Sequence, residues 1–236
     1  MSEARECDAG GTEFDRFADS YDEDLRRALS VSGEDKDYFC EGRMKWLGEW
    51  LADGGFKARA VLDYGCGTGS ATPHVFRRLG AERVVGSDVS VASLEVARAA
   101  HGGGKVTFRQ TGEGGEGEFD VAFCNGVFHH ITPERRPAAL DEIFAGLRPG
   151  GVFAMFENNP WNPGTRYVMS RCVFDRDAMT LTPPEARRVM RDAGFRVVAT
   201  RYLFVFPRAL RFLRFMESAL SPLPLGAQYV VMGVRP

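Results

Sequence analysis

The chain has 236 residues, of which 44% are hydrophobic and 26% are charged, a composition typical of a soluble globular domain. Its formal net charge of −2 excludes a general electrostatic attraction to nucleic acid or to an anionic membrane, so neither is expected as a partner. There is no apolar run of about 18 residues and the N-terminus is polar, so we expect no membrane span and no signal peptide.

The five cysteines are scattered along the chain and form no C-x-x-C pair. An odd number of isolated cysteines predicts reduced thiols in a cytoplasmic protein, and neither a disulfide framework nor a zinc site. We therefore predict no bound metal. The cysteines are Cys7, Cys40, Cys66, Cys124 and Cys172.

The N-terminal region predicts a disordered tail followed by a helical lid. Residues 1–11 are interpreted as the tail and residues 12–55 as the lid. Phe14, Phe17 and Tyr21 recur at helical spacing, so they share one face of a helix. From residue 12 to residue 236 the chain is predicted to form a single domain.

A glycine loop follows the apolar run Ala60-Val61-Leu62, which reads as a buried strand. The loop is Asp63-Tyr64-Gly65-Cys66-Gly67-Thr68-Gly69, and a helix is predicted to begin near Ser70. A strand, a tight glycine loop and a helix form a nucleotide-binding corner. The G-x-G-x-G spacing differs from the dinucleotide pattern G-x-G-x-x-G, which favours an adenosyl group that carries an amino acid over a pyrophosphate.

Three further motifs follow the loop between residues 58 and 157, where strands and helices alternate as in a parallel sheet. The run Val84–Ser90 reads as a second strand and contains Asp88, about 20 residues after the loop, where a ribose-binding carboxylate belongs. Phe119–Asn125 reads as a fourth strand, and Leu147–Gly151 as the turn into a fifth.

With these four motifs in order, the chain resembles the class I S-adenosylmethionine (SAM)-dependent methyltransferases. The resemblance implies an α/β, Rossmann-like, doubly wound sheet of seven strands in the order 3-2-1-4-5-7-6, with an antiparallel last hairpin strand. It also implies SAM as cofactor. The residues that it places at the cofactor are Tyr21, Asp63, Gly65, Cys66, Gly67, Gly69, Asp88, Val89, Thr111, Gly112, Asn125, Gly126 and Val127.

Two residues are candidates for acid–base chemistry. His129 follows the fourth strand and Glu157 ends the fifth, an arrangement similar to small-molecule O-methyltransferases. A hydroxyl acceptor must lose its proton, and a histidine oriented by a carboxylate suits that task. For Glu157 an ion pair with an arginine of the insertion is the alternative. His130, the second histidine, is placed at the substrate or in a structural role.

The last part of the chain is predicted to shape the acceptor side. Residues 158–181 read as an irregular insertion, and residues 182–236 as a helix, an edge hairpin and a helix inserted at about 207–220. The inserted helix is expected to pack on the core, with a dimer contact or a membrane-surface element as alternatives. The candidate acceptor contacts are Tyr38, His130, Trp161, Tyr167 and Arg171.

The sequence thus predicts a methyltransferase, monomeric or homodimeric, that methylates a hydroxyl of a small molecule in specialised metabolism. An amine acceptor stays open, because the residues do not separate O- from N-methylation. A nicotinamide-dependent oxidoreductase, a nucleic-acid or protein methyltransferase and a binding protein without activity are the rivals. The glycine spacing argues against the first, and the charge balance against a nucleic-acid enzyme.

Overall fold

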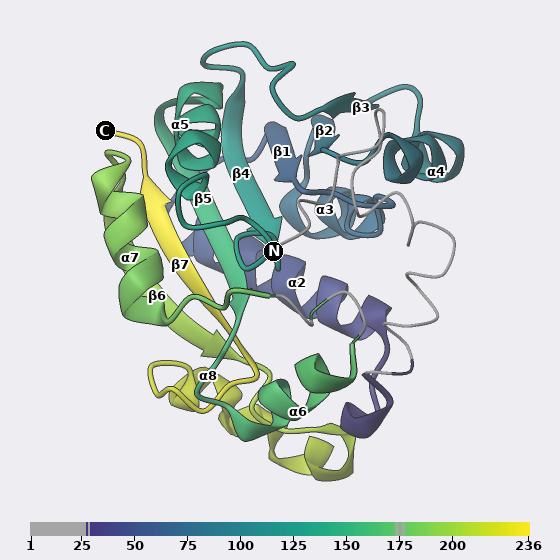
Figure 1. Ribbon diagram of the computed structural model, residues 1–236, viewed down its shortest axis with the longest axis vertical. Coiled ribbons are helices and arrows are strands. Elements are labelled where there is room, and N and C mark those ends of the chain that lie inside the picture. The colour runs from purple at the N-terminus through teal and green to yellow at the C-terminus, as the bar shows by residue number, and fades with distance from the viewer. Residues whose placement is uncertain (1–26, 28, 173–174, 176–177) are drawn as a thin grey trace, which may run out of the picture.

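A seven-stranded sheet forms the centre of the computed structural model, which describes residues 27, 29–172, 175 and 178–236 (Figure 1). The strand order is β3-β2-β1-β4-β5-β7-β6. The strands are β1 (Ala60–Tyr64), β2 (Arg83–Asp88), β3 (Val106–Gln110), β4 (Phe119–Asn125), β5 (Leu147–Asn158), β6 (Arg196–Leu203) and β7 (Gln228–Val234).

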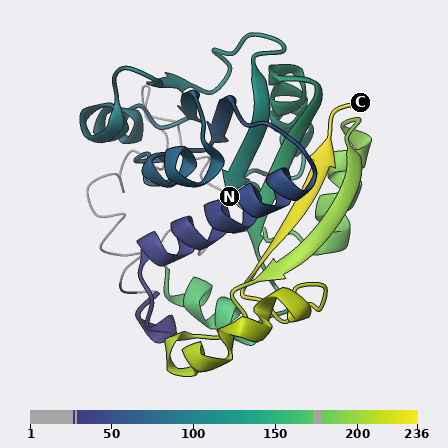
Figure 2. The ribbon, with the colours of Figure 1, turned by 180° about the vertical axis from the view of Figure 1, so that it is seen from behind.

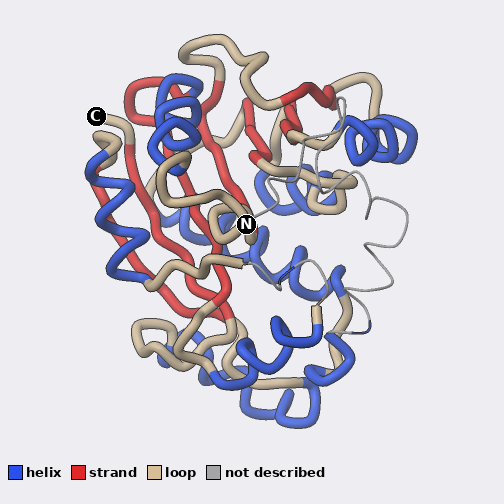
Figure 3. The backbone as a smooth tube through the Cα atoms, in the orientation of Figure 1, coloured by secondary structure: helices blue, strands red, loops and turns tan. Residues whose placement is uncertain are grey.

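Helices lie on both faces of this sheet (Figure 3). They are α2 (Lys36–Asp53), α3 (Thr72–Leu79), α4 (Val91–His101), α5 (Arg136–Gly146), α6 (Pro163–Arg171), α7 (Pro183–Asp192) and α8 (Glu217–Leu220), with 3₁₀ helices η2 (Ser30–Ser32) and η4 (Arg208–Met216). The predicted tail, residues 1–11, and the predicted cofactor residue Tyr21 lie outside the described residues.

The pairing of the strands confirms the predicted topology. β1 pairs in parallel with β2 and β4, and β4 pairs in parallel with β5. β7 runs antiparallel to both β5 and β6. Parallel neighbours need crossover connections, which the intervening helices supply, whereas β7 returns as the edge hairpin expected from the resemblance.

The sheet has a hydrophobic core on each face because successive strand residues point to opposite sides. In β1, Val61 packs on one side with Met44 and Leu47 of α2, while Leu62 packs on the other with Leu140 of α5. All five residues of β1 are buried, as expected of a central strand covered on both faces. This burial fixes the position of the loop that leaves β1.

Polar caps fix where several helices begin. The Asp35 side chain accepts a hydrogen bond from the Tyr38 backbone N–H at the start of α2. Asn162 does the same for Thr165 at the start of α6. The prediction of an irregular insertion over 158–181 was therefore wrong for Pro163–Arg171, where an asparagine cap and a proline in the first turn begin a helix.

The segment between β6 and β7 also differs from its prediction. A helix is present, but most of it is the 3₁₀ helix η4, with a non-helical backbone at Leu210, and none of its residues is buried. Phe212 and Phe215 are 68% and 81% exposed, so packing on the core was the wrong interpretation. The kink at Leu210 breaks the apolar stripe of a regular helix, and the segment lies away from the sheet (Figure 2).

None of the helices within the described part of the chain has the length and apolar character needed to cross a membrane.

Candidate active site

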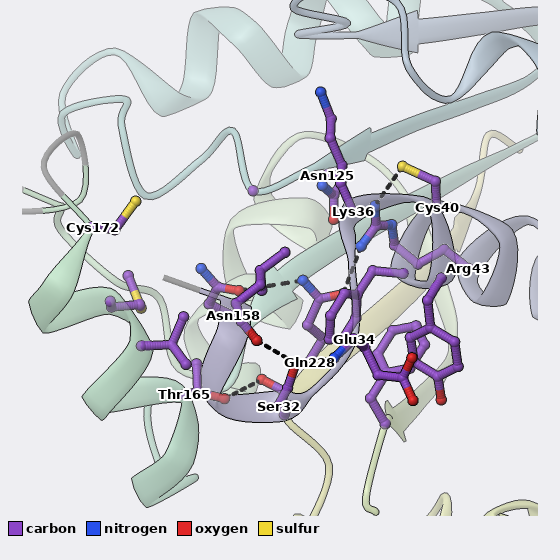
Figure 4. Close-up of a pocket in the computed structure, with 18 of the residues that line it drawn as sticks. Ser32, Glu34, Lys36, Cys40, Arg43, Asn125, Asn158, Thr165, Cys172 and Gln228 are labelled. Carbon is purple, nitrogen blue, oxygen red and sulfur yellow. Dashed lines mark hydrogen bonds between the residues drawn. The ribbon is translucent and has the colours of Figure 1, made fainter. Parts of the chain in front are cut away.

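A cavity of about 400 Å³ lies at the carboxyl ends of β1, β4 and β5. Its floor is the glycine loop and Asn125, and its walls come from α2, α6 and the segment after β6. Figure 4 shows side chains from these separate elements pointing into one space, among them Arg43, Asn158 and Gln228. Carboxyl ends of strands at a reversal of strand order are the usual ligand site of such sheets.

The glycine loop adopts a backbone that favours glycine. Gly65, Gly67 and Gly69 have φ angles of 72°, 52° and 76°. A Cβ atom at Gly65 would lie only 2.4 Å from Val127, so the two loops approach too closely for a side chain. The backbone N–H groups of Gly65 and Cys66 both donate to the Ser87 carbonyl, which holds the loop against β2.

Asp88 binds the backbone around the loop. Its Oδ2 accepts the Gly67 N–H at 2.8 Å and its Oδ1 accepts the Ser90 N–H at 2.9 Å. Its roles at the ribose, and those of the other residues predicted around the adenosyl group, stay predictions. Asp88 does not line the cavity, and the same holds for Gly69, Val89, Thr111, Gly112 and Val127.

Two buried groups of opposite charge face the cavity. Within the described residues, Oδ2 of Asp63 has no hydrogen-bond partner, and the same is true of Oδ1 of Asn125. Arg43 of α2 is 5% exposed and donates to Oε1 of Gln228 at 3.0 Å and to Sγ of Cys40. An unpaired buried acceptor beside a buried cation is unfavourable unless a ligand completes the arrangement.

The burial of Asp63 changes its pKa. Burial, with a smaller contribution from the charge of Asp88, outweighs Arg43 and raises the pKa to about 7. Such a carboxyl binds a proton in the folded state between pH 4 and 7 where the unfolded chain has lost it.

We therefore expect the ligand-free protein to lose stability as the pH rises from about 4 to about 7, by up to about 4 kcal/mol from this group. The stability that neutral Asp63 contributes is complete below the unfolded pKa and is lost as the pH rises through the folded one. Urea denaturation across this range, compared between the wild type and Asp63→Asn, measures the effect. Equal pH slopes for the two proteins would contradict it.

Two histidines and two carboxylates meet at the far side of the cavity. We call His129, His130, Glu157 and Asp175 the histidine–carboxylate cluster. His129 Nδ1 lies 2.6 Å from Glu157 Oε2, and Glu157 Oε1 accepts the Phe128 N–H at 2.7 Å. Asp175 Oδ1 lies 3.4 Å from His129 Nε2 and 3.5 Å from His130 Nε2. The predicted pair of His129 and Glu157 is thus in direct contact, and Glu157 pairs with a histidine instead of an insertion arginine.

The surroundings of the two imidazoles shift their pKa values in opposite directions. Burial lowers the pKa of His129, but Glu157 and Asp175 together outweigh it and raise the pKa to about 10. Burial and the charge of His129 lower the pKa of His130 to about 4. The ligand-free protein therefore holds His129 charged between two carboxylates and His130 neutral.

Some of the predicted acceptor contacts line the cavity and others do not. Tyr38 and His130 line it, as do Thr165, Val168 and Met169 from the inner face of α6. Three predicted contacts do not line the cavity and stay predictions: Trp161 and Tyr167 are 49% and 46% exposed, and Arg171 packs over the Tyr167 ring at 5.2 Å. The helical period of α6 places Tyr167 and Arg171 on its outer face, and Trp161 precedes the helix.

Sequence reasoning missed one member of the cluster and gave another cavity residue no role. Asp175 follows α6 in the insertion, 45 residues after His130, so no local spacing connects it to the histidines. Arg43, which lines the cavity, had no predicted role. The sequence held a signal for this role: Arg43 lies beside the apolar residues Met44 and Leu47 on the buried side of a helix. An arginine in such a position is rarely buried unless it has a partner of opposite charge or a hydrogen-bond acceptor.

Comparison with known proteins identifies this architecture. Residues 61–151, which include the glycine loop, Asp88 and His129, match the family model of a methyltransferase domain. This part of the chain is therefore similar to a methyltransferase domain. The match supports the predicted methyltransferase, and the observed strand order is the one that the resemblance implies.

Three similar proteins show the range of the family. The ubiquinone biosynthesis O-methyltransferase of Psychrobacter arcticus is 33% identical over 61% of this chain and 62% of its own length. N-demethylindolmycin N-methyltransferase of Streptomyces griseus is 27% identical over 48% and 50%. The structure of a TehB-like SAM-dependent methyltransferase from Corynebacterium glutamicum has a TM-score of 0.62 and 16% identity, over 94% of this chain and 99% of that one.

The chain spans less than two thirds of the length of the curated relatives that it matches. Among the relatives described above, one is named for transfer to oxygen and one for transfer to nitrogen. The names of these relatives therefore do not determine the acceptor of this chain, and the residues of its own cavity must be considered.

Proposed function

We propose that this methyltransferase transfers the methyl group of SAM to a hydroxyl oxygen of a small-molecule acceptor. The observation that carries the proposal is the position of the histidine–carboxylate cluster, which shares one cavity with the glycine loop. A cavity of about 400 Å³ has the size of a small-molecule site. Its cover of α2 and α6 favours a compact acceptor over a folded macromolecule.

The residues of the cavity fit the amino-acid end of the cofactor. An α-amino acid carries an ammonium and a carboxylate, and Asp63 and Arg43 offer one buried group of each complementary charge. Asn125 adds a free acceptor oxygen among the described residues. When bound, SAM supplies a methyl group already activated on a sulfonium. The glycine loop lets such a ligand approach the backbone closely, since Gly65 and Gly67 have no side chain.

The protein then has two tasks, to align the acceptor oxygen with the methyl carbon and to receive a proton. The acceptor hydroxyl would give its proton to His130, the imidazole of the histidine–carboxylate cluster that is neutral in the ligand-free protein. Asp175 connects both imidazoles, and Glu157 fixes the orientation of His129. Apolar side chains of α6, Val168 and Met169, exclude water from this end of the cavity.

Titration by calorimetry with S-adenosylhomocysteine and with NADH tests the cofactor, and only the first should bind. Incubation with methyl-deuterated SAM and a panel of hydroxylated and amino compounds, followed by mass spectrometry, tests the acceptor. Label that appears only on amines would reject O-methylation, and NADH binding alone would reject the methyltransferase.

We expect His129→Ala to lower the rate of methyl transfer about 10²- to 10⁴-fold and to leave the affinity for S-adenosylhomocysteine unchanged. The reason is that His129 belongs to the proton-accepting cluster and not to the cofactor-binding loop. Lys45→Ala is the control, because Lys45 is exposed and pairs with Glu49 on the surface of α2. Equal rates in His129→Ala and the wild type would show that His129 takes no part in the reaction.

A further inference from the structure

Three side-chain atoms of the histidine–carboxylate cluster converge on one point. One ligand atom each of His129, His130 and Asp175 lies within 4.8 Å of the other two, and Nε2 of both histidines faces Oδ1 of Asp175. Ligands held about 2.1 Å from a tetrahedral ion lie about 3.4 Å apart, which matches the two histidine–aspartate distances of 3.4 and 3.5 Å. We propose that His129, His130 and Asp175 bind a divalent transition-metal ion at the acceptor end of the cavity.

The outer partners of His129 support this assignment independently. A metal-binding histidine commonly donates its second ring N–H to a carboxylate, which fixes the tautomer and the direction of the free nitrogen. Glu157 occupies that position at 2.6 Å from Nδ1 and is itself held by the Phe128 N–H. The His129 carbonyl accepts the Met179 N–H at 2.7 Å, so the chain after Asp175 is tied back to the histidine.

His74 shows how a histidine in a simple ion pair differs. It is also buried between two carboxylates, with Glu41 at 2.6 Å from Nδ1 and Asp37 at 2.8 Å from Nε2. Those carboxylates bind opposite sides of one ring, and no second imidazole joins them in the described part of the chain. At the cluster, by contrast, the His130 ring centre lies 4.1 Å from that of His129 and its Nε2 faces the same oxygen.

The ligand types select the class of ion. Two imidazoles and one carboxylate suit Zn²⁺, Fe²⁺, Co²⁺ or Ni²⁺, whereas Mg²⁺ and Ca²⁺ prefer oxygen ligands alone. Three protein ligands leave at least one position for water or another oxygen. Given the proposed O-methylation, on which this part of the inference rests, the acceptor hydroxyl would occupy that position, where the ion would lower its pKa so that its proton is lost to water in place of the imidazoles. The ion-binding site itself does not depend on the identity of the acceptor.

Cobalt binding tests the proposal directly. The purified protein is treated with a chelator, dialysed and titrated with Co²⁺, while visible absorption and metal content are recorded. We expect saturation at one ion per chain, displacement by Zn²⁺, and a more than 100-fold loss of affinity in His130→Ala and in Asp175→Asn. Glu157→Gln should weaken binding about 10- to 100-fold through the orientation of His129.

Asp37→Asn is the matched control, because it removes a carboxylate from a histidine outside the cluster, and it should bind Co²⁺ like the wild type. Circular dichroism and titration with S-adenosylhomocysteine verify that each variant is folded. No saturable binding by the wild type, or equal binding by the wild type, His130→Ala and Asp175→Asn, would overturn the proposal. Failure to bind S-adenosylhomocysteine would instead reject the proposed function and leave the cobalt result valid.

Discussion

Replacement of Gly65 by alanine is expected to abolish binding of S-adenosylhomocysteine and to destabilise the fold. Two costs add at this position. A left-handed backbone costs an alanine about 1–2 kcal/mol, and the φ of Gly65 is 72°. The new Cβ would also lie 2.4 Å from Val127, so the glycine loop or the segment after β4 must move. Calorimetric titration and thermal denaturation measure the two effects.

Gly55 supplies the control for the backbone cost. Its φ is 71°, but apart from Gly55 itself and its two chain neighbours no atom of the described residues lies within 4 Å of the position of its Cβ. Gly55→Ala should therefore lose about 1–2 kcal/mol of stability and keep its affinity for S-adenosylhomocysteine. Adding Val127→Ala to Gly65→Ala should restore part of the affinity, because it removes the clashing methyl groups. Equal affinities in Gly65→Ala and Gly55→Ala would show that the close approach of the two loops is unimportant.

The sheet and the glycine loop were predictable because their signals are local. An apolar run such as Ala60-Val61-Leu62 buries a strand on both faces, and the glycines after it report left-handed backbone directly. The order of the strands is not local, and it came from the resemblance to a family. Pairing of His129 with Glu157 followed from the same source, since both stand at carboxyl ends of adjacent strands, β4 and β5.

The acceptor side was less predictable because its residues meet only through the tertiary fold. Asp175 contacts both histidines but lies 45 residues after His130 in the sequence, so no local sequence pattern connects them. Trp161, Tyr167 and Arg171 were chosen by residue type, but the phase of α6 points Thr165 inward and Tyr167 outward. No bound metal was predicted, because the prediction rested on the spacing of the cysteines. Two adjacent histidines and a carboxylate far away in the sequence give no such local signal.

Removal of Glu157 is expected to have the largest effect on stability. Its side chain is 1% exposed and joins two partners, the Phe128 N–H and His129 Nδ1. Glu157→Ala leaves a buried imidazole without its carboxylate and a backbone donor without its acceptor. Breaking a buried pair in this way costs about 3–5 kcal/mol. Urea denaturation at neutral pH should show this loss in the free energy of unfolding.

Two further variants distinguish the loss of the Phe128 hydrogen bond from the loss of the contact with His129. Glu157→Gln should lose less, because its carbonyl oxygen can still accept the Phe128 N–H. His129→Ala combined with Glu157→Ala should lose less than the sum of the two single variants, since each single change leaves the other partner unpaired. Glu185→Ala is the matched control: this exposed glutamate also accepts a backbone N–H, at Thr182, and its loss should cost about 1 kcal/mol. Additive losses for His129 and Glu157 would mean that the two side chains contribute to stability independently, despite the 2.6 Å between them.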